Sequence, residues 1–284
     1  MHIILGGTGH VGSAVAETLL AKGEPVTVVG HDPAKANAWE AKGAKFAKAD
    51  VHDEAALREV LRTGRHAFLL NPPAAVTTDT DVEERRTIAA ILAALEGSGL
   101  EKLVGESTYG ARPGERCGDL NTLWELEQGL AAQDIPYAIN RGAYYFSNWA
   151  MNLQEVREQG VLRTMFDPGF ELPMVAPEDL GRHAAALMTD DRTGMFLVEG
   201  PRRYTPQDVA EAFAAALARP VRVETIPRDQ WVATFKATGF SDAAAESYSR
   251  MTAATADSPG WPDDVIRGQT RLEDYIAGLA GSPV

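Results

Sequence analysis

The chain has 284 residues, 45% of them hydrophobic, and a formal net charge of -13 at pH 7. This composition is typical of a globular protein with a sizeable core, and no apolar run approaches the roughly 20 residues of a membrane helix. The acidic balance and the lack of a Lys/Arg cluster exclude nucleic acid and anionic membranes as expected partners. A single cysteine, Cys117, and no basic leader before the first strand predict a cytoplasmic protein.

Short apolar runs alternate with helix-period segments from residue 1 to about residue 150, as in parallel sheets built from βαβ units. The expected strands are residues 2–5, 25–29, 45–47, 67–70, 102–105 and 137–140; the expected helices are residues 9–22, 80–96 and 120–132, with a short helix capped by Asp53. This order predicts an α/β fold of the Rossmann type, with a doubly wound parallel sheet. We expect a dinucleotide-binding domain over residues 1–150.

The alternation loosens after residue 150. The expected elements are a helix at 178–188, a strand at 195–198, a helix begun by Thr205 and Pro206, a strand at 221–224, and helices near Gln230, Asp242 and Arg271. Residues 254–264 are expected to form a surface loop. The pattern predicts that residues 151–284 form a smaller α+β lobe over the carboxyl edge of the sheet, with segments near 175–200 returning to the first domain.

A glycine-rich loop follows the first strand directly and opens the first amphipathic helix. Gly6 permits the tight turn, Gly9 lets the backbone approach a pyrophosphate, and Gly12 lets the helix pack closely on the sheet. The helix N-terminus adds free N–H groups and a positive dipole end. A turn without a ligand is the alternative interpretation. We expect the loop to bind a nicotinamide dinucleotide through Gly6, Thr8, Gly9, His10, Val11 and Gly12.

The loop sequence GGTGHVG resembles that of the NmrA-like branch of the atypical short-chain dehydrogenases/reductases. Further segments that resemble this family are 31–36 (HDPAKA), 49–53 (ADVHD), 135–142 (IPYAINRG), 146–148 (FSN), 172–181 (LPMVAPEDLG) and 270–276 (TRLEDYI). Together they cover nearly the whole chain. The family includes NADPH-dependent quinone, isoflavone-type and triphenylmethane-dye reductases, and also proteins that bind the dinucleotide and report redox state to a partner.

The resemblance implies a site for the cofactor's ribose after the second strand. His31 stands where the family usually carries the Arg that grips the 2′-phosphate of NADP, and a neutral imidazole cannot form that bidentate contact. Lys35 is a second candidate for the phosphate. Asp32 either accepts from a ribose 2′-hydroxyl, as in NAD sites, or only starts the turn before Pro33. The resemblance alone favours NADP over NAD.

Two further pairs of residues follow later strands of the expected sheet. Asp50 and Val51 stand where the family cradles the adenine. Asn71 and Pro72 are expected to line the path toward the nicotinamide, or simply to end the strand. Arg141 lies in the segment expected around the nicotinamide.

The usual catalytic pair of short-chain reductases is missing. In that pair a Lys four residues beyond a Tyr lowers the tyrosine pKa, so that the Tyr can donate a proton. None of the seven tyrosines has a Lys at that spacing, and no lysine occurs between Lys102 and Lys236. Leu123 stands where many NmrA-like reductases carry a Lys, four residues before Glu127.

The remaining catalytic candidates are Ser107, Tyr109 and Tyr144. The aromatic run formed by Tyr144, Tyr145, Phe146 and Trp149 either stacks on a planar substrate or packs in the core. The six histidines show no metal-ligand spacing, so we expect no metal site.

Two functional hypotheses follow. The first is an NAD(P)H-dependent reductase of a planar, quinone-like small molecule, since such an acceptor needs little more than a face-on position at the nicotinamide. The alternative is a non-catalytic NAD(P) sensor that acts through a protein partner. The missing Lys and Arg favour the sensor, whereas the aromatic run favours the reductase.

Overall fold

The computed structural model describes residues 1–281, and its centre is an eight-stranded sheet of order β12-β10-β6-β5-β4-β1-β2-β3. Every neighbouring pair in it is parallel. The strands are β1 (His2–Ile4), β2 (Val26–Gly30), β3 (Lys45–Lys48), β4 (His66–Leu69), β5 (Lys102–Thr108), β6 (Tyr137–Gly142), β10 (Gly194–Glu199) and β12 (Ile266–Arg267). The order reverses between β1 and β4, the switch point at which doubly wound sheets bind dinucleotides.

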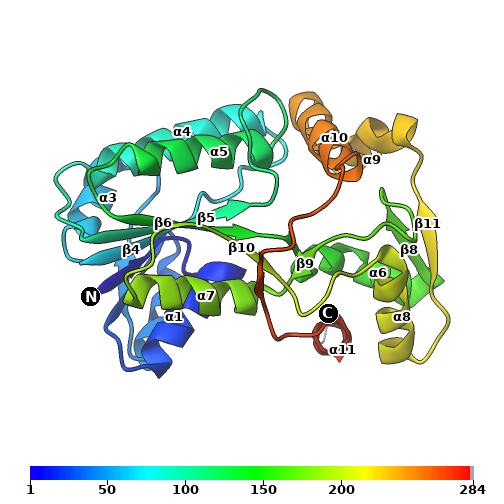
Figure 1. Cartoon of the computed structure of the whole chain (residues 1–284), viewed down its shortest axis with the longest axis horizontal. Coiled ribbons are helices and arrows are strands. Elements are labelled where there is room, and N and C mark those ends of the chain that lie inside the picture. The colour runs from blue at the N-terminus through cyan, green and yellow to red at the C-terminus, as the bar shows by residue number, and fades with distance from the viewer. Residues whose placement is uncertain (282–284) are drawn as a thin grey trace.

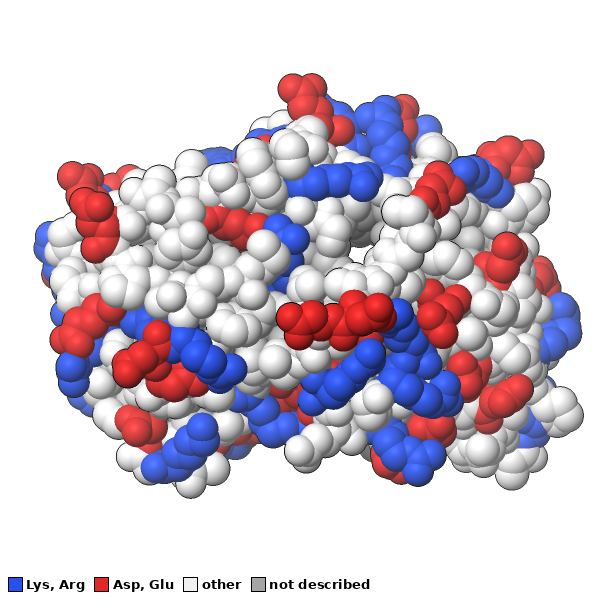
Figure 2. Space-filling view, in the orientation of Figure 1, with Lys and Arg blue, Asp and Glu red and all other residues white. Residues whose placement is uncertain are grey.

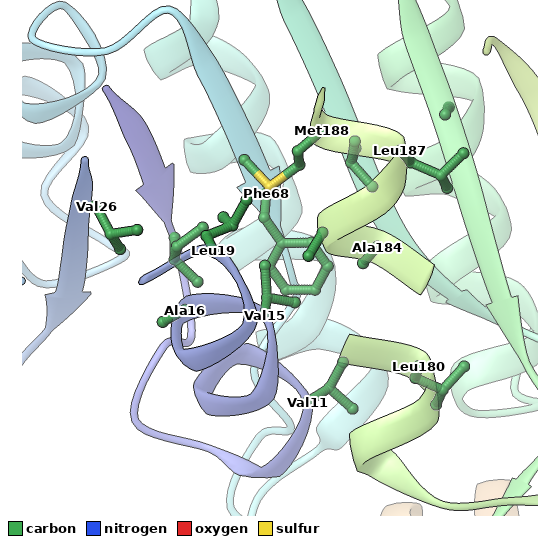
Figure 3. Packing of buried hydrophobic residues seen from close by; sticks show 14 of the residues in the cluster. Val11, Val15, Ala16, Leu19, Val26, Phe68, Leu180, Ala184, Leu187 and Met188 are labelled. Atoms are coloured by element: carbon green, nitrogen blue, oxygen red, sulfur yellow. The ribbon is translucent and has the colours of Figure 1, made fainter. Parts of the chain in front are cut away.

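Helices cover both faces of this sheet (Figure 1). They are α1 (His10–Ala21), α2 (Ala36–Ala41), α3 (Glu54–Leu61), α4 (Thr80–Leu95), α5 (Asp119–Ala131) and α7 (Pro177–Thr189). Helices α3, α4 and α5 bury one apolar cluster, and α1 and α7 bury another. Figure 3 shows Val15, Ala184 and Met188 of the second cluster gathered around Phe68 of β4. A Cβ on Gly181 would lie 2.3 Å from Ala14 Cβ, so this glycine allows α7 to cross close to α1.

A smaller lobe lies beyond the carboxyl ends of the sheet (Figure 1). It contains two short parallel pairs, β8 (Val161–Thr164) with β11 (Arg222–Thr225) and β7 (Tyr144–Tyr145) with β9 (Met174–Val175). Its helices are α6 (Leu153–Gln159), α8 (Pro206–Leu217), α9 (Trp231–Ala237), α10 (Asp242–Ala256) and α11 (Leu272–Gly281). A separate core cluster of aromatic and aliphatic side chains holds this lobe together.

The expected α/β fold with a doubly wound parallel sheet is confirmed. The N-caps expected at Asp53 and Thr205 are present, and Thr205 forms a reciprocal capping box with Asp208. Strand β5 runs to Thr108 rather than ending at Gly105, because Glu106 and Ser107 stay paired with β6. The expected loop at 254–264 was placed too early, since residues 254–256 complete α10. Within residues 1–281 no helix is long and apolar enough to cross a membrane.

Candidate functional site

The glycine-rich loop joins β1 to α1 and folds as a tight turn. Gly6 has a left-handed backbone conformation, with φ of 70°, and its carbonyl oxygen accepts from the Gly9 N–H at 3.0 Å. A Cβ on Gly12 would lie 2.2 Å from this oxygen, so only glycine lets α1 begin so close to the loop. A Cβ on Gly9 would meet only the same oxygen, at 3.5 Å. The space beside Gly9 is therefore open.

The surroundings of this open space suit an anionic group. No side chain caps α1, and its first turn holds no acidic residue, so the partial positive charge of the helix N-terminus is left uncompensated. Nearby, a Cβ on Gly6 would lie 3.0 Å from Leu70 Cδ2. The next residue, Asn71, has a buried side-chain oxygen without a hydrogen-bond partner among the described residues. An open anion cradle beside an unpaired acceptor fits a dinucleotide.

The other loop residues differ in what they present. Val11 belongs to the core beside Leu180 (Figure 3), so only its backbone is available at the helix end. His10 is exposed. Thr8 lies at the end of β2, because a Cβ on Gly30 would come within 3.2 Å of Thr8 Cγ2.

The residues expected after β2 and β3 lie at the same carboxyl edge of the sheet. His31 and Lys35 are exposed. Asp32 Oδ1 accepts from the Ala34 N–H at 2.9 Å, so this residue caps the turn, which is one of its two expected roles. Asp50 Oδ1 accepts from the His52 N–H at 2.9 Å and leaves the second oxygen outside that contact. Val51 is half-buried against the core, and Pro72 is half-buried beside Asn71.

Ser107 and Arg141 meet at a buried carboxylate, Glu127 of α5. The Ser107 hydroxyl donates to Glu127 Oε1 at 2.5 Å. Arg141 grips both oxygens of Glu127, through Nε at 2.7 Å and Nη2 at 2.6 Å. This bidentate pair fixes the guanidinium and leaves Nη1 outside the contact. The structure therefore ties both expected site residues to Glu127, which the sequence analysis named only as the reference point for Leu123.

Tyr109 is bound to a second buried carboxylate. Its hydroxyl lies 3.3 Å from Oε1 of Glu199, which is fully buried at the end of β10. Arg203 and Arg267 also donate to Glu199, at 3.2 and 2.7 Å. Burial, followed by the charge of Glu199, raises the pKa of Tyr109 well above its usual value. Tyr109 is therefore held in its protonated form by Glu199, and its raised pKa makes it a weak proton donor.

Tyr144 lies in the aromatic core of the smaller lobe. Its ring centroid is 5.6 Å from that of Trp149 and 6.0 Å from that of Phe166. Burial raises the pKa of Tyr144 to about 12, so it is also a weak proton donor. Ser107, Tyr109 and Tyr144 thus lie near the carboxyl ends of β5 and β6. Arg267 and Arg203 act to lower the pKa of Tyr109, but burial and the charge of Glu199 outweigh them, so neither tyrosine has a lowered pKa.

A third buried carboxylate, Glu106, lies on the opposite face of β5 from Ser107. The Asn140 amide donates to Glu106 Oε2 at 2.7 Å, and the Tyr145 hydroxyl lies 3.2 Å from Oε1. Burial raises the pKa of Glu106 to about 8, so its carboxyl is mostly protonated at pH 7. The sequence offered one signal for this residue: a carboxylate directly after the apolar run of β5.

Three more carboxylates lie where α10 docks on α4 and α5: Asp81 and Glu84, which are buried, and Asp119, which is half-buried. The Ser247 hydroxyl of α10 donates to Asp81 Oδ1 at 2.5 Å, and the Thr122 hydroxyl donates to Glu84 Oε2 at 2.9 Å. Burial raises the pKa of Glu84 to about 7 and that of Asp119 to about 6. Other titratable groups here include Arg85 on α4, which lies 3.6 Å from Asp81 and 2.9 Å from Glu125, and Tyr248 on α10.

This cluster predicts that stability falls as pH rises from about 4.5 to about 7. Because the pKa of Glu84 is higher in the folded than in the unfolded chain, the folded state binds more protons across this window. Glu84→Gln keeps the hydrogen-bonding shape without the charge. We expect it to raise the free energy of unfolding at pH 8 by about 2–3 kcal/mol, and less at pH 5.

Urea denaturation at both pH values measures this difference. Glu83→Gln is the matched control, since Glu83 precedes Glu84 on α4 and forms only a 3.8 Å ion pair with Arg86. Equal gains for Glu84→Gln at pH 5 and pH 8 would show that the Glu84 carboxyl does not titrate in this range.

The structure holds two cavities of note. The larger, about 470 Å³, lies at the amino ends of β6 and β10 and is remote from the glycine-rich loop. The other, about 320 Å³, lies in the smaller lobe. Across residues 1–281, no group of three His, Cys, Asp or Glu side chains is arranged to hold a metal ion.

Comparison with known proteins identifies the relatives of this chain. A family model described as the NmrA-like family matches residues 2–258. An NAD(P)H azoreductase from Xenophilus azovorans is 24% identical over 285 residues, which cover 100% of this chain and 94% of that protein. The nitrogen metabolite regulation-like protein bik4 of Gibberella fujikuroi is 26% identical over 208 residues, covering 67% and 61%.

Among solved structures, the Escherichia coli NADPH-dependent quinone oxidoreductase QOR2, in complex with NADPH, has the same fold. The TM-score is 0.79 at 23% sequence identity, and the match covers 98% of this chain and 99% of that one.

Proposed function

Because this chain belongs to the NmrA-like family, we propose that it is an NAD(P)H-dependent oxidoreductase that reduces a planar, quinone-like small molecule. The observation that carries the proposal is the open space at Gly9 beside the uncapped end of α1. The unpaired oxygen of Asn71, which follows the neighbouring strand β4, supports it. The relatives named as an NAD(P)H azoreductase and an NADPH-dependent quinone oxidoreductase support the same class of reaction. The single cysteine and acidic composition support a cytoplasmic enzyme without a nucleic-acid partner.

The chain's own residues have separable roles toward the cofactor. Backbone N–H groups of the loop from Gly6 to Gly12, with Thr8, His10 and Val11, would bind the pyrophosphate. His31 and Lys35 would lie at the ribose, Asp50 and Val51 at the adenine, and Asn71, Pro72 and Arg141 toward the nicotinamide. When bound, the dinucleotide supplies a hydride.

The kind of substrate that the enzyme can reduce follows from the absence of a proton donor with a tuned pKa. Ser107 donates to Glu127, Tyr109 lies on Glu199, and Tyr144 has a pKa of about 12. None of the three is poised to protonate a substrate near pH 7, so we assign them to shaping the pocket. Reduction of a quinone tolerates this, because its weakly basic product takes a proton from water.

Incubating the purified protein with NADPH or NADH and 1,4-benzoquinone tests the proposal directly. We expect loss of nicotinamide absorbance at 340 nm, with formation of hydroquinone. Tight cofactor binding without turnover of any acceptor would refute the reductase.

A sensor of NAD(P) acting through a protein partner is the second candidate. Tyr109 and Arg141 favour it, since both are held by buried carboxylates rather than left available for chemistry. The relative named as a nitrogen metabolite regulation-like protein favours it as well.

Cofactor selectivity gives a second test of the ribose site. If His31 faces the 2′-phosphate, His31→Arg should raise NADPH affinity by about 1–2 kcal/mol, or roughly five- to thirtyfold in Kd, with little gain for NADH. Fluorescence titration with both cofactors measures it. Asn37→Arg, an exposed position on α2, controls for the added charge. Equal gains for both cofactors in His31→Arg would place residue 31 away from the phosphate.

A further inference from the structure

Helix α10 is attached to the loop that follows β4, residues 71–79. Ser241, the N-cap of α10, donates its backbone N–H to the Val76 carbonyl oxygen at 2.8 Å and its hydroxyl to the Thr78 carbonyl oxygen at 2.6 Å. Asn71, which is proposed to lie toward the nicotinamide, begins the same loop. The position of α10 therefore fixes a loop of the proposed cofactor site.

A second attachment lies in the middle of α10, at Ser247, which is 1% exposed. Its hydroxyl donates to Asp81 Oδ1 at 2.5 Å and accepts from the Gly118 N–H at 2.9 Å. Gly118 ends the loop that follows β5, residues 109–118, and a Cβ on it would lie 3.0 Å from Met251 Sδ of α10. Helix α10 thus fastens the loops that follow two neighbouring strands of the sheet (Figure 1).

The attachment at α10 stands on the carboxylate cluster formed by Asp81, Glu84 and Asp119. Glu84 Oε1 accepts from the Ala74 N–H, in the loop after β4, at 3.4 Å. Asp119 hydrogen-bonds to Glu84. Tyr248 of α10 faces the cluster from the other side, since burial and then the charges of the three carboxylates raise its pKa. The cluster is therefore enclosed between α4, α5, the loop after β4 and α10.

The carboxylate cluster has more negative than positive charge around it. Arg85 lies 3.6 Å from Asp81 but is shared with Glu125, 2.9 Å away. Arg116 is bound to Asp79 by two hydrogen bonds, of 2.8 and 2.7 Å. On the molecular surface shown in Figure 2, by contrast, Asp and Glu lie interspersed with Lys and Arg. Ionisation of the whole cluster would therefore place like charges side by side and away from water.

Protonation of the cluster favours the docked position of α10. Burial raises the pKa of Glu84 from 4.5 to about 7 and that of Asp119 to about 6, and release of the helix would expose both to water. The docked state then binds more protons than the released state, so docking weakens as pH rises from about 4.5 to about 7. The other groups that face the cluster, Tyr248 on α10 and Tyr145 on β7, stay protonated in this window, because burial and nearby carboxylates raise the pKa of each.

The connections of α10 leave it free to move together with α9. Phe235 of α9 and Phe240 pack on Tyr248, with ring centroids 5.9 and 5.1 Å away, so the two helices form one unit. This unit joins the rest of the chain through residues 226–230 and 257–265, and the second segment contains neither helix nor strand. Its release would break no hydrogen bond of the eight-stranded sheet.

We propose that α10 is a pH-operated latch on the nicotinamide end of the site, docked at acidic pH and released as the pH rises. The docked helix holds the loops after β4 and β5 in place, so that a bound dinucleotide leaves slowly. Release of α10 frees both loops and speeds the departure of the cofactor. This effect on the cofactor rests on the proposed function, whereas the docking itself does not.

Hydrogen exchange followed by mass spectrometry, corrected for the intrinsic rate at each pH, tests the latch in the full chain. Between pH 5 and pH 8 we expect the protection of residues 242–256 to fall roughly tenfold or more. At both pH values it should stay below that of residues 102–108 in β5, since α10 opens without unfolding of the sheet. Glu84→Gln should remove the pH dependence. Glu83→Gln, on the same helix, is the matched control and should behave as the native chain.

Two results of this measurement would overturn the latch. Equal protection of residues 242–256 and 102–108 would show that α10 is released only when the whole chain unfolds. Protection of α10 that does not change with pH in the native chain would show that the carboxylate cluster does not control docking.

A second variant tests the attachment itself. Ser247→Ala removes the hydroxyl between Asp81 and the Gly118 N–H, and should lower the protection of α10 at pH 5 roughly tenfold. Ser249→Ala, at the half-buried serine two residues further along α10, is the matched control. Unchanged protection of α10 in Ser247→Ala would also overturn the latch.

The effect on the cofactor has its own measurement. At pH 8 we expect NADPH to dissociate roughly threefold or more slowly from Glu84→Gln than from the native chain, and at equal rates at pH 5, as followed by stopped-flow fluorescence. Comparing the two proteins at one pH cancels the titration of other groups. Equal rates at pH 8 would overturn the action of the latch on the cofactor. If the chain binds no dinucleotide, the proposed function fails, and hydrogen exchange still decides whether the latch exists.

Discussion

Replacing Gly9 with valine is expected to raise the Kd for NADPH and NADH on the order of 100-fold or more, since charge-assisted phosphate contacts would be lost. The backbone at Gly9 has φ of -94°, which any residue adopts, and a Cβ there meets only the Gly6 oxygen at 3.5 Å. The variant should therefore fold. Its branched side chain would fill the space above the end of α1. Calorimetric titration measures the affinity, and circular dichroism checks the fold.

Gly12→Ala is the complementary control on the same turn, because it should lower stability whereas Gly9→Val should lower cofactor affinity. Its Cβ would lie 2.2 Å from the Gly6 carbonyl oxygen, so the helix or the loop must move, and stability should fall by about 1–3 kcal/mol. Gly9→Ala, with one methyl group, should weaken cofactor binding less than Gly9→Val. A folded Gly9→Val protein that binds NADPH as tightly as the native chain would place the cofactor elsewhere.

These two glycines show which part of the site was predictable from the sequence. The loop is a local motif: a strand, a turn and a helix follow one another within a dozen residues, and their glycine spacing carries the geometry. The order of the βαβ units was predictable for the same reason, because each unit has its own periodicity. The N-caps at Asp53 and Thr205 each accept a hydrogen bond from the backbone N–H three residues later, and the sequence predicted both correctly for the same reason.

The carboxylates that hold the other candidates were not predictable in this way. Ser107 meets Glu127 across 20 residues of chain, and Tyr109 meets Glu199 across 90. Glu106 remains in β5 because Asn140, 34 residues away, satisfies it on the neighbouring strand. Polar residues at the end of an apolar run look like a strand stop unless their partners are known. The expected end of β5 at Gly105 was wrong for that reason.

The smaller lobe was harder still. Strands β8 and β11 have four residues each, and their pairing joins Arg163 to Glu224 across 61 residues. Helices α6 and α9 have seven residues each, too short for a clear period. The sequence showed the aromatic residues of this lobe, but it could not decide whether the run from Tyr144 to Trp149 packs in the core or stacks on a planar substrate. The structure shows Tyr144 and Trp149 packed against each other in the core of the smaller lobe, with ring centroids 5.6 Å apart, as the core interpretation expects.

The last expected result separates quinones from simple carbonyl compounds. With NADPH, kcat/KM for 1,4-benzoquinone should exceed that for benzaldehyde or cyclohexanone by at least a hundredfold, the usual contribution of a general acid being about 10²- to 10⁴-fold. A ketone develops a basic alkoxide that needs a proton donor of tuned pKa. Here burial raises the pKa of Tyr109 and Tyr144 instead of lowering it.

Leu123→Lys tests the physical reason for that difference. Leu123 packs beside the core on α5, one turn before Glu127, which accepts from Ser107. A cation introduced there would favour ionised groups nearby, so carbonyl reduction should gain while quinone turnover changes less than threefold, because the quinone step already takes its proton from water. Leu92→Lys, half-buried on α4 against the same core cluster, controls for the cost of burying a lysine. Robust ketone reduction by the native chain would mean that a buried group acts as the acid after all, and Glu106, with its pKa of about 8, would be the first to examine.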